Sequence, residues 1–349
     1  MSFTLVTGAT GFLGSQLVRT LIERGESVKA LVRPGANLAA LSGYPSDRFK
    51  IAVGDMRIEQ SVFAALANCT RLYHVAAHFK LWDPEPSRII SPTVEGMRAT
   101  LRAARARKLE KIVVTSAAGV LGTTTSEAPM DESREFNLDD PEAYFEAKVA
   151  ADQVATEFSA EGLPIVTVLQ STIAGPGDWK PTPNGRLLLE YLKTPSTSHF
   201  PVSGGGLNVV DVEDVAVGHV LAMERGVVGE RYLLGGDDLT FSQLFETLCD
   251  LTGLAEPSTP KSKGLMKFAG RLFELNARLR GGDPRTTSRM VNDYVDTFSY
   301  VTSKKAERAL GYRHRPAREA LSRSVRWYLA NGYVPAKEAS RVRLELRPV

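Results

Sequence analysis

Cysteine is scarce in this chain of 349 residues, which contains only Cys69 and Cys249. Two thiols that lie so far apart exclude a disulfide framework and a metal site made of thiolates. The five histidines add no metal-binding pattern, because no carboxylate lies at metal-ligand spacing from them. We therefore expect a protein of the reducing cytoplasm that holds no metal ion.

Long apolar runs and an excess of one charge are also lacking. No stretch approaches 18 uninterrupted apolar residues, so the sequence predicts no membrane span. Apolar strand residues begin within three positions of Met1, so we expect no signal peptide. The 43 basic and 40 acidic residues are scattered along the chain, whereas a nucleic-acid partner would require a dense basic stripe. We expect a small-molecule partner instead.

The first 170 residues alternate short apolar runs with helical patterns. We predict strands at 3–6, 28–32, 49–53, 71–75, 112–115 and 165–169. Between the first two runs, apolar residues recur at the helical period over 13–22, and Gly25 stands just past the end. Strands separated by helices indicate a parallel sheet covered on both faces. The sequence therefore predicts an α/β fold with a doubly wound parallel sheet, which is a Rossmann fold.

A glycine-rich loop, Thr7 to Gly14, joins the first predicted strand to the first predicted helix. Gly8 and Gly11 would let the backbone turn tightly beside a pyrophosphate, and the helix N-terminus would offer unpaired N–H groups to the phosphates. The spacing is GxxGxxG rather than the commoner GxGxxG, and an ordinary strand-to-helix turn is the alternative. We predict a dinucleotide site here, formed by Gly8, Thr10, Gly11, Phe12 and Leu13.

Two later loops refine the predicted cofactor. Arg33 follows the second predicted strand, where many dinucleotide-binding folds carry an acidic residue for the ribose 2′-hydroxyl. An arginine there favours a 2′-phosphate, so NADP(H) is the preferred cofactor and NAD(H) the alternative. Asp55 follows the third strand with Met56 beside it, and it is placed to accept a hydrogen bond from the adenine amino group. Solvent-facing residues after a strand are the plainer interpretation of both Arg33 and Asp55.

Tyr144 and Lys148 are four residues apart, so a helix would place both on one face. Asp140 as the N-cap, Pro141 as the first helical residue and Glu142 in the first turn predict that such a helix begins here. A free phenol has a pKa of about 10, too high for proton transfer at neutral pH. A neighbouring ammonium and an oxidised nicotinamide would lower that pKa. We predict that Tyr144 exchanges a proton with the substrate and that Lys148 assists it.

With these motifs, the chain resembles the extended short-chain dehydrogenase/reductase family, within the NAD-dependent epimerase/dehydratase superfamily. The matching motifs are TGATGFLG at 7–14, GDM at 54–56, HVAA at 74–77, YFEAK at 144–148 and GPGD at 175–178. Two later segments are also similar to family elements, the returning segment at 208–216 and the late LGY element at 305–312. Within the family the chain is most similar to dihydroflavonol-reductase-like, 3β-hydroxysteroid-dehydrogenase-like and hopanoid-associated members, the last through residues 180–186.

The resemblance implies a two-part molecule and an activity. An NAD(P)-binding Rossmann domain would occupy 1–172, with return segments near 207–222, and a smaller substrate-binding α/β region would occupy 173–349. The implied reaction is hydride transfer between NADP(H) and a secondary alcohol or ketone on a bulky, lipid-like ring system such as a sterol, triterpenoid or flavonoid. Oxidation of a 3β-hydroxysterol followed by decarboxylation is one version of it. The resemblance also implies a homodimer, and cofactor contacts at Ala76, Thr115, Ser171 and Thr172 besides Tyr144 and Lys148.

One position departs from the family pattern. The family commonly reads TSS after the fifth strand, and its second serine polarises the substrate carbonyl, but this chain reads Thr115-Ser116-Ala117. Loss of one such donor typically costs about 100- to 1000-fold in rate. We include Ser116 in the catalytic set as a substitute, and we predict that Tyr144→Phe costs far more activity than Ser116→Ala.

Substrate contacts are expected from Arg186 and from residues that follow HVAA, namely His78, Phe79 and Trp82. The two aromatic residues have packing as an equal alternative. Further along, apolar residues at 265, 266, 268, 269, 272, 273 and 275 are interleaved with Lys267 and Arg271. This pattern predicts an amphipathic helix. It would either face the core of the smaller region or act as a lid or peripheral membrane contact for a lipid substrate.

Two other functions are open on the sequence alone. A sugar-nucleotide epimerase of the same family would retain NAD tightly, but 171–176 lacks the Asn and Tyr typical of those enzymes. A non-catalytic NADP-binding sensor is favoured by Ala117, whereas the intact Tyr144 and Lys148 argue against it. The sequence therefore favours an NADP-dependent oxidoreductase.

Overall fold

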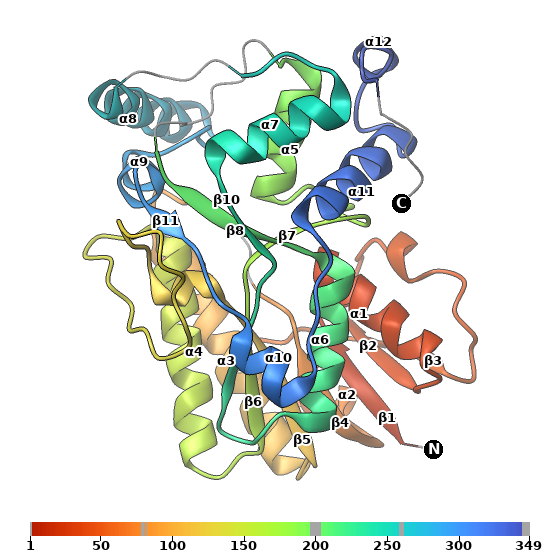
Figure 1. The fold of residues 1–349 in the computed structure, drawn as a ribbon. Coiled ribbons are helices and arrows are strands. Elements are labelled where there is room, and N and C mark those ends of the chain that lie inside the picture. Colours follow the sequence, from red (N-terminus) through yellow and green to blue (C-terminus); the bar gives the residue numbers. More distant parts are fainter. Residues whose placement is uncertain (1, 78–79, 81, 196–203, 258–261, 344–349) are drawn as a thin grey trace.

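A computed structural model describes residues 2–77, 80, 82–195, 204–257 and 262–343. Its larger sheet has seven parallel strands in the order β3-β2-β1-β4-β5-β6-β9 (Figure 1). They are β1 (Phe3–Thr7), β2 (Val28–Val32), β3 (Phe49–Val53), β4 (Cys69–His74), β5 (Lys111–Ala117), β6 (Ile165–Gln170) and β9 (Arg231–Leu234). The predicted doubly wound parallel sheet is confirmed, and the six predicted strands are present with ends that shift by at most two residues.

Helices cover both faces of this sheet (Figure 1). One face carries α1 (Phe12–Glu23), α6 (Val212–Arg225) and α10 (Lys304–Leu310). The other carries α2 (Glu59–Ala65), α3 (Ser87–Ala106) and α4 (Ala143–Ala160). Alternate residues of each strand enter the two cores, as Val113 and Val114 of β5 do. The carboxyl ends of β1, β4 and β5 therefore meet at one edge, where the predicted site residues follow them.

A smaller sheet with four strands is centred on β8 (Gly206–Asp211), which pairs with one antiparallel strand and two short parallel ones. The partners are β10 (Asp237–Thr240), β7 (Thr172–Ala174) and β11 (Phe298–Ser299). The helices α5 (Pro183–Lys193), α7 (Phe241–Thr252) and α11 (Ala317–Ala330) form a separate apolar core with it. The remaining elements are α8 (Lys263–Arg280), α9 (Ser288–Tyr294), α12 (Ala336–Ala339) and the short 3-10 helices Ala39–Leu41 and Ala118–Leu121.

The two sheets are joined where β8 continues directly into α6. Asp211 ends β8, is fully buried, and caps α6 by accepting a hydrogen bond from the Glu213 backbone N–H at 2.8 Å. Its other carboxylate oxygen accepts from Arg323 of α11 at 2.8 Å. A second tie comes from α1, where the Gln16 side-chain amide donates to the carbonyl of Pro176 at 2.9 Å. Both layers therefore share buried polar contacts at this junction.

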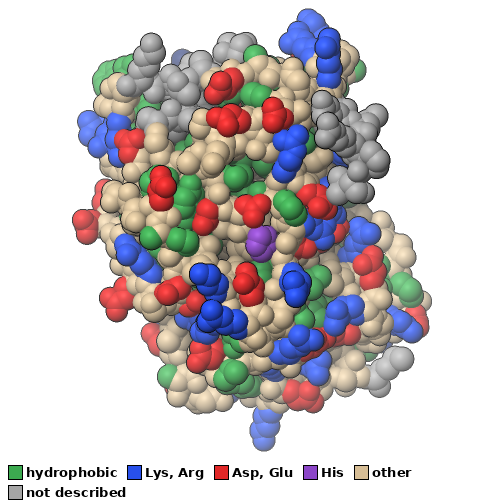
Figure 2. Space-filling model, viewed as in Figure 1, with side chains coloured by type: hydrophobic (Ala, Val, Ile, Leu, Met, Phe, Trp, Pro, Cys, Tyr) green, Lys and Arg blue, Asp and Glu red, His purple; other side chains and the backbone are tan. Residues whose placement is uncertain are grey.

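The surface and helix composition bear on partners. On the face drawn in Figure 2, basic and acidic side chains are interspersed rather than separated. Among the described residues, no helix is both long and apolar enough to cross a membrane.

The amphipathic pattern predicted near 265–275 does form a helix, α8, but the interpretation that this helix faces the core is wrong. Five of its large apolar side chains are exposed, and the residues of the helix that are buried are Met266, Gly270 and Ala277.

Candidate active site

The loop between β1 and α1 has the shape that a pyrophosphate requires. Gly8 adopts a φ of +71°, a left-handed conformation that side chains other than glycine rarely tolerate. A Cβ at this position would also lie 2.7 Å from the Ala76 backbone nitrogen. At Gly14, a Cβ would overlap the carbonyl oxygen of Gly8. The loop is therefore drawn tightly onto both the helix and the end of β4.

The N-terminus of α1 is open toward this loop. Gly11 is the N-cap, and no side chain caps the helix, so the first N–H groups of α1 have no partner within the helix. Aligned peptide dipoles add a partial positive charge there. Phe12 and Thr10 are half-buried, whereas Leu13 is buried and packs into the core. The chain thus offers a cradle of backbone donors that fits a dinucleotide pyrophosphate, and the buried side chain of Leu13 leaves only its backbone for the predicted cofactor contact.

We expect Gly14→Ala to lower the free energy of unfolding by roughly 1–3 kcal/mol, because its methyl group would displace the Gly8 carbonyl. The same displacement should weaken NADPH binding. Urea unfolding and fluorescence titration with NADPH would measure the two effects. Gly264→Ala is the matched control, since this glycine is also helical and a Cβ there meets nothing nearer than 3.7 Å. Wild-type values for both properties in Gly14→Ala would contradict the predicted role of the loop.

The end of β4 is tied to the loop by a buried polar chain. The Thr7 hydroxyl oxygen accepts from the Ala76 backbone N–H at 3.2 Å and lies 2.9 Å from His74 Nδ1. Burial and the nearby Lys148 lower the pKa of His74 to about 4, so this ring is neutral at physiological pH. A neutral ring carries one N–H, so the Thr7 hydroxyl and His74 Nδ1 share a single proton in this hydrogen bond. The chain fixes Ala76 beside Gly8, where a cofactor contact is predicted.

The ends of β2 and β3 bring cations together. Arg33 is exposed directly after β2, and its charge contributes to lowering the pKa of Asp55. The main cause of that lowering is Arg57, whose guanidinium donates to the Asp55 carboxylate at 2.6 Å. The predicted acceptor for adenine is therefore engaged by an arginine that the sequence analysis did not single out. Met56 packs against Gly96 of α3.

Tyr144 and Lys148 share one face of α4, as predicted, but the helix begins later than predicted. Its N-cap is Glu142, which has extended backbone angles, and Ala143 is the first helical residue. The prediction of Asp140 as N-cap is wrong, because Asp140 instead pairs with Arg289 at 2.8 Å. Nor does Glu142 lie in the first turn, since its buried carboxylate accepts a hydrogen bond from Thr287. The start of α4 is thus fixed by residues of the segment around α9.

Burial dominates the ionisation of the pair. It raises the pKa of the Tyr144 phenol well above its ordinary value, so the chain by itself keeps this proton at neutral pH. Burial also lowers the pKa of Lys148 to about 8, although Asp152 one turn later opposes the shift. Asp152 is held by Arg231 of β9 at 3.0 Å. Lys148 therefore carries its charge in a place where desolvation makes that charge costly.

A second aromatic group lies beside Tyr144 that the sequence patterns did not indicate. Tyr294 ends α9 and packs against Phe145, with ring centroids 5.8 Å apart. Its phenol interacts electrostatically with Tyr144, and burial raises its pKa well above the ordinary value. No motif marks Tyr294, because a contact across 150 positions leaves no spacing signal. It places a protonated hydroxyl from the smaller region close to the predicted proton donor.

At the end of β5, the side chains of Thr115, Ser116 and Ala117 have different surroundings. Thr115 faces α6, where its hydroxyl lies 2.9 Å from His219 Nε2. His219 Nδ1 must donate to the Val215 carbonyl at 2.8 Å, so Nε2 accepts and the Thr115 hydroxyl is the donor. Ser116 faces the opposite side, and its buried Oγ has no hydrogen-bond partner among the described residues. Ala117 is half-buried at the position expected for the polarising hydroxyl.

The other predicted residues lie in different surroundings. Ser171 continues the ladder from β6 through its N–H to Leu234 at 3.2 Å, and its Oγ is buried without a partner in the described chain. Thr172 of β7 pairs with Val209 of β8. Trp82 is buried, with 8% of its surface exposed. The predicted contacts at His78 and Phe79 lie outside the described residues.

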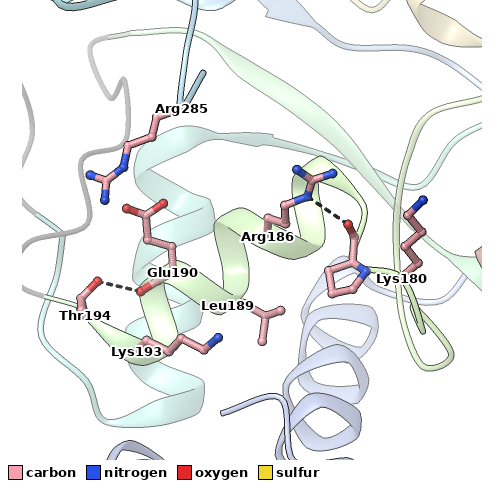
Figure 3. Close-up of a pocket in the computed structure, with 8 residues that line it drawn as sticks. Lys180, Arg186, Leu189, Glu190, Lys193, Thr194 and Arg285 are labelled. Carbon is pink, nitrogen blue, oxygen red and sulfur yellow. Dashed lines mark hydrogen bonds between the residues drawn. The ribbon is translucent and has the colours of Figure 1, made fainter. Parts of the chain in front are cut away.

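Arg186 lines an open cavity of about 520 Å³ between α5 and the segment after α8 (Figure 3). The cavity is bordered by Lys180, Pro181, Arg186, Leu189, Glu190, Lys193, Thr194 and Arg285. Arg186 donates to the Pro181 carbonyl at 3.2 Å and pairs with Asp283 at 3.5 Å. Neither Tyr144 nor Lys148 borders this cavity, so the structure does not bring Arg186 together with the catalytic pair.

Known proteins share these features. The sequence model of the NAD dependent epimerase/dehydratase family matches residues 4–235. A protein of Synechocystis sp. with a provisional name as dihydroflavonol 4-reductase is 34% identical, over 94% of this chain and 95% of its own. Sterol demethylase protein B of Methylococcus capsulatus is 31% identical, over 95% of this chain and 99% of its own.

A solved structure agrees with the sequence relatives. The crystal structure of gox2253 superposes with a TM-score of 0.83 at 34% identity, and the match covers 96% of this chain and 100% of that one. The glycine cradle, the parallel sheet and the Tyr144–Lys148 pair thus occur in a chain that matches a family model and full-length relatives. The chain belongs to the NAD dependent epimerase/dehydratase family, among the extended short-chain dehydrogenases/reductases, and it is an NAD(P)-dependent oxidoreductase.

Proposed function

We propose that the protein is an NADP(H)-preferring oxidoreductase that interconverts a secondary alcohol and a ketone on a bulky ring substrate. The observation that carries the proposal is the pairing of Tyr144 and Lys148 on one face of α4, together with a glycine cradle and an arginine after β2. When bound, the dinucleotide supplies or accepts a hydride at its nicotinamide. Tyr144 and Lys148 handle the proton and the position of the reacting groups.

In the reductive direction Tyr144 gives its proton to the substrate oxygen. Burial keeps the phenol protonated before reaction, which is the state that a general acid needs. The Lys148 ammonium would bind the nicotinamide ribose hydroxyls and favour the phenolate that remains. In the oxidative direction the same phenolate takes the proton from the alcohol, and positive charge next to it is then required.

The preference for NADP(H) rests on charge at the ends of β2 and β3. Arg33 is exposed there and its charge acts on the Asp55 carboxylate, to which Arg57 donates a hydrogen bond. No acidic side chain directly follows β2, so nothing at that position would bind a ribose 2′-hydroxyl as a carboxylate does. Two guanidinium groups beside one carboxylate favour a 2′-phosphate, to which arginine binds bidentately.

The substrate class is supported by the names of the relatives, dihydroflavonol 4-reductase and sterol demethylase protein B. Both point to a ring system rather than a sugar nucleotide. If the substrate is a 3β-hydroxysterol with a 4-carboxylate, loss of a hydride to NADP⁺ and of the hydroxyl proton to Tyr144 yields a β-keto acid. That acid loses carbon dioxide as its C–C bond electrons form an enolate, which then takes up a proton.

A second candidate, a non-catalytic NADP-binding sensor, is favoured by one observation. Ala117 stands where the family carries a hydroxyl, and the neighbouring Ser116 hydroxyl is buried on the other side of β5. Such a protein would bind NADPH tightly without turnover of any carbonyl substrate.

The family resemblance also supports a homodimer. The α3 and α4 helices lie side by side and are linked on their exposed surface by Arg98–Glu157 and Arg105–Glu161 at 3.2 and 2.5 Å. Such a packed pair of helices offers the surface through which two copies would associate.

The test is a pair of titrations with NADPH and NADH, followed by nicotinamide absorbance assays on steroid, flavonoid and sugar-nucleotide panels. We expect tighter NADPH binding and turnover on a polycyclic alcohol or ketone. Turnover on sugar nucleotides alone would contradict the substrate class, and binding without any turnover would favour the sensor.

Arg33→Asp isolates the cofactor preference. Removing one phosphate contact and adding repulsion should shift the ratio of NADPH to NADH dissociation constants by roughly 30-fold or more toward NADH. Arg318→Asp is the matched control, because this exposed arginine lies on α11 and pairs only weakly with Asp250 at 3.5 Å. An unchanged ratio in Arg33→Asp would remove the argument for NADP(H).

A further inference from the structure

The α8 helix exposes a regular apolar stripe. Its members are Leu265, Phe268, Leu272, Leu275 and Leu279, with exposed fractions of 64, 60, 50, 53 and 77%. Spacings of three and four residues place all five on one side of the helix. In Figure 2, hydrophobic side chains reach the surface at the upper left, where Figure 1 places α8. Scattered exposed leucines are ordinary, but a contiguous stripe marks an interaction surface.

The opposite side of α8 is already fixed to the protein. Met266 shares a small core with Val291 and Val295, and Gly270 lies against the backbone of 287–288. The Glu274 carboxylate accepts from the Ser288 backbone N–H at 2.7 Å, and Lys263 donates to the Val295 carbonyl at 2.7 Å. The helix is thus anchored through Met266, Gly270, Glu274 and Lys263, whereas the stripe residues belong to no apolar core of the described chain.

The charges on α8 are nearly all positive. Its sequence has five basic residues, Lys263, Lys267, Arg271, Arg278 and Arg280. Its one acidic residue, Glu274, is engaged with Ser288. After the helix, Arg285 borders the cavity that is also lined by Lys180, Arg186 and Lys193 and by one acidic residue, Glu190 (Figure 3). An apolar stripe with cations on its flanks combines the two attractions that hold a helix at an anionic bilayer surface.

We propose that α8 docks the protein onto a membrane surface that contains anionic lipids, with the leucine stripe inserted among the acyl chains and the flanking cations at the headgroups. Charge selects this occupant over a second copy of the chain. Two α8 helices face to face would oppose a net charge of the same sign, and no acidic stripe on α8 complements it. The inference concerns binding alone and does not depend on the proposed reaction.

Vesicle sedimentation of the 349-residue protein, without substrate or cofactor, tests the proposal. We expect binding to vesicles of phosphatidylcholine mixed with phosphatidylglycerol, weak binding to phosphatidylcholine alone, and release as salt is raised. Lys267→Gln/Arg271→Gln should weaken the partition coefficient by about fivefold for each charge removed. Leu272→Ser/Leu275→Ser should weaken it by at least about tenfold.

Val227→Ser/Val228→Ser is the matched control, since both valines are exposed, at 59 and 49%, and lie outside α8. This variant should bind vesicles as the wild type does. Absence of binding to either vesicle type, or binding that both α8 variants retain, would overturn the proposal. A concentration-dependent dimer in size-exclusion chromatography that Leu272→Ser/Leu275→Ser abolishes would assign the stripe to a second copy instead. Because vesicle sedimentation does not measure carbonyl turnover, failure of the proposed reaction would leave the outcome for membrane binding unaffected.

Discussion

Tyr144→Phe is expected to lower kcat by about three orders of magnitude, since general acid-base catalysis typically contributes 100- to 10,000-fold. The phenol hydroxyl is the group of Tyr144 that can exchange a proton, and the substitution removes it. The phenylalanine ring retains the edge contact with the Phe145 ring, whose centroid lies 5.4 Å away. The NADPH dissociation constant should change little. Steady-state assays at saturating NADPH on the best substrate of the panel, together with a fluorescence titration, would measure both.

Ser116→Ala is the companion variant. The Ser116 hydroxyl is buried and makes no hydrogen bond among the described residues, so its removal should change kcat by no more than a few fold. Equal losses in the two variants would mean that Ser116 turns toward the substrate and replaces the hydroxyl absent at Ala117. Full activity in Tyr144→Phe would instead remove this residue from the reaction.

Lys148→Met is expected to have opposite effects on activity and stability. Activity should fall by roughly 100-fold or more, because the ribose contact and the charge beside Tyr144 are lost. At pH 7 the free energy of unfolding should rise on the order of 1–3 kcal/mol, since burial lowers the pKa of Lys148 to about 8. A buried ammonium opposes folding, and methionine fills similar space without a charge.

The sign of this effect follows from the two pKa values. The folded pKa lies below the unfolded value of about 10.4, so the folded protein holds the proton less well. The cost is full below about pH 8 and disappears as the pH rises past the unfolded pKa. Urea unfolding at pH 7 and pH 10.5 should therefore show a stabilised variant only at the lower pH. Lys304→Met, at an exposed lysine that begins α10, should show no difference, and a destabilised Lys148→Met at pH 7 would contradict the argument.

The fold was predictable where residues report on their own neighbours. The buried strands β1 to β6 and the helix α1 were recognisable because period-2 and period-3.6 patterns are local. The start of α4 was not, since Asp140 and Glu142 are engaged by Arg289 and Thr287, which lie 149 and 145 positions away. Distant partners overrode the local capping preference.

The candidate site divides along the same line. Gly8, Tyr144 and Lys148 were predicted because their chemistry requires fixed spacings. Tyr294 and Arg57 were not predicted, because each lies beside a predicted site residue through a contact that no motif encodes. The direction of the α8 stripe was also beyond the sequence, because an amphipathic pattern states that one side differs from the other and does not state which side meets water.

The order of elements along the chain also constrains how the protein is made. The α1 face of the larger sheet is closed by α6 and α10, and the last edge strand is β9, all of which follow residue 206. A nascent chain that has emerged only as far as β6 therefore presents Val6, Val113 and Val166 without the cover of α6 and α10. Such an exposed apolar sheet is prone to aggregation. Completion of the larger sheet and its helical cover must wait for synthesis of α6, β9 and α10, and a ribosome that stalls before α10 would leave a chain dependent on chaperones.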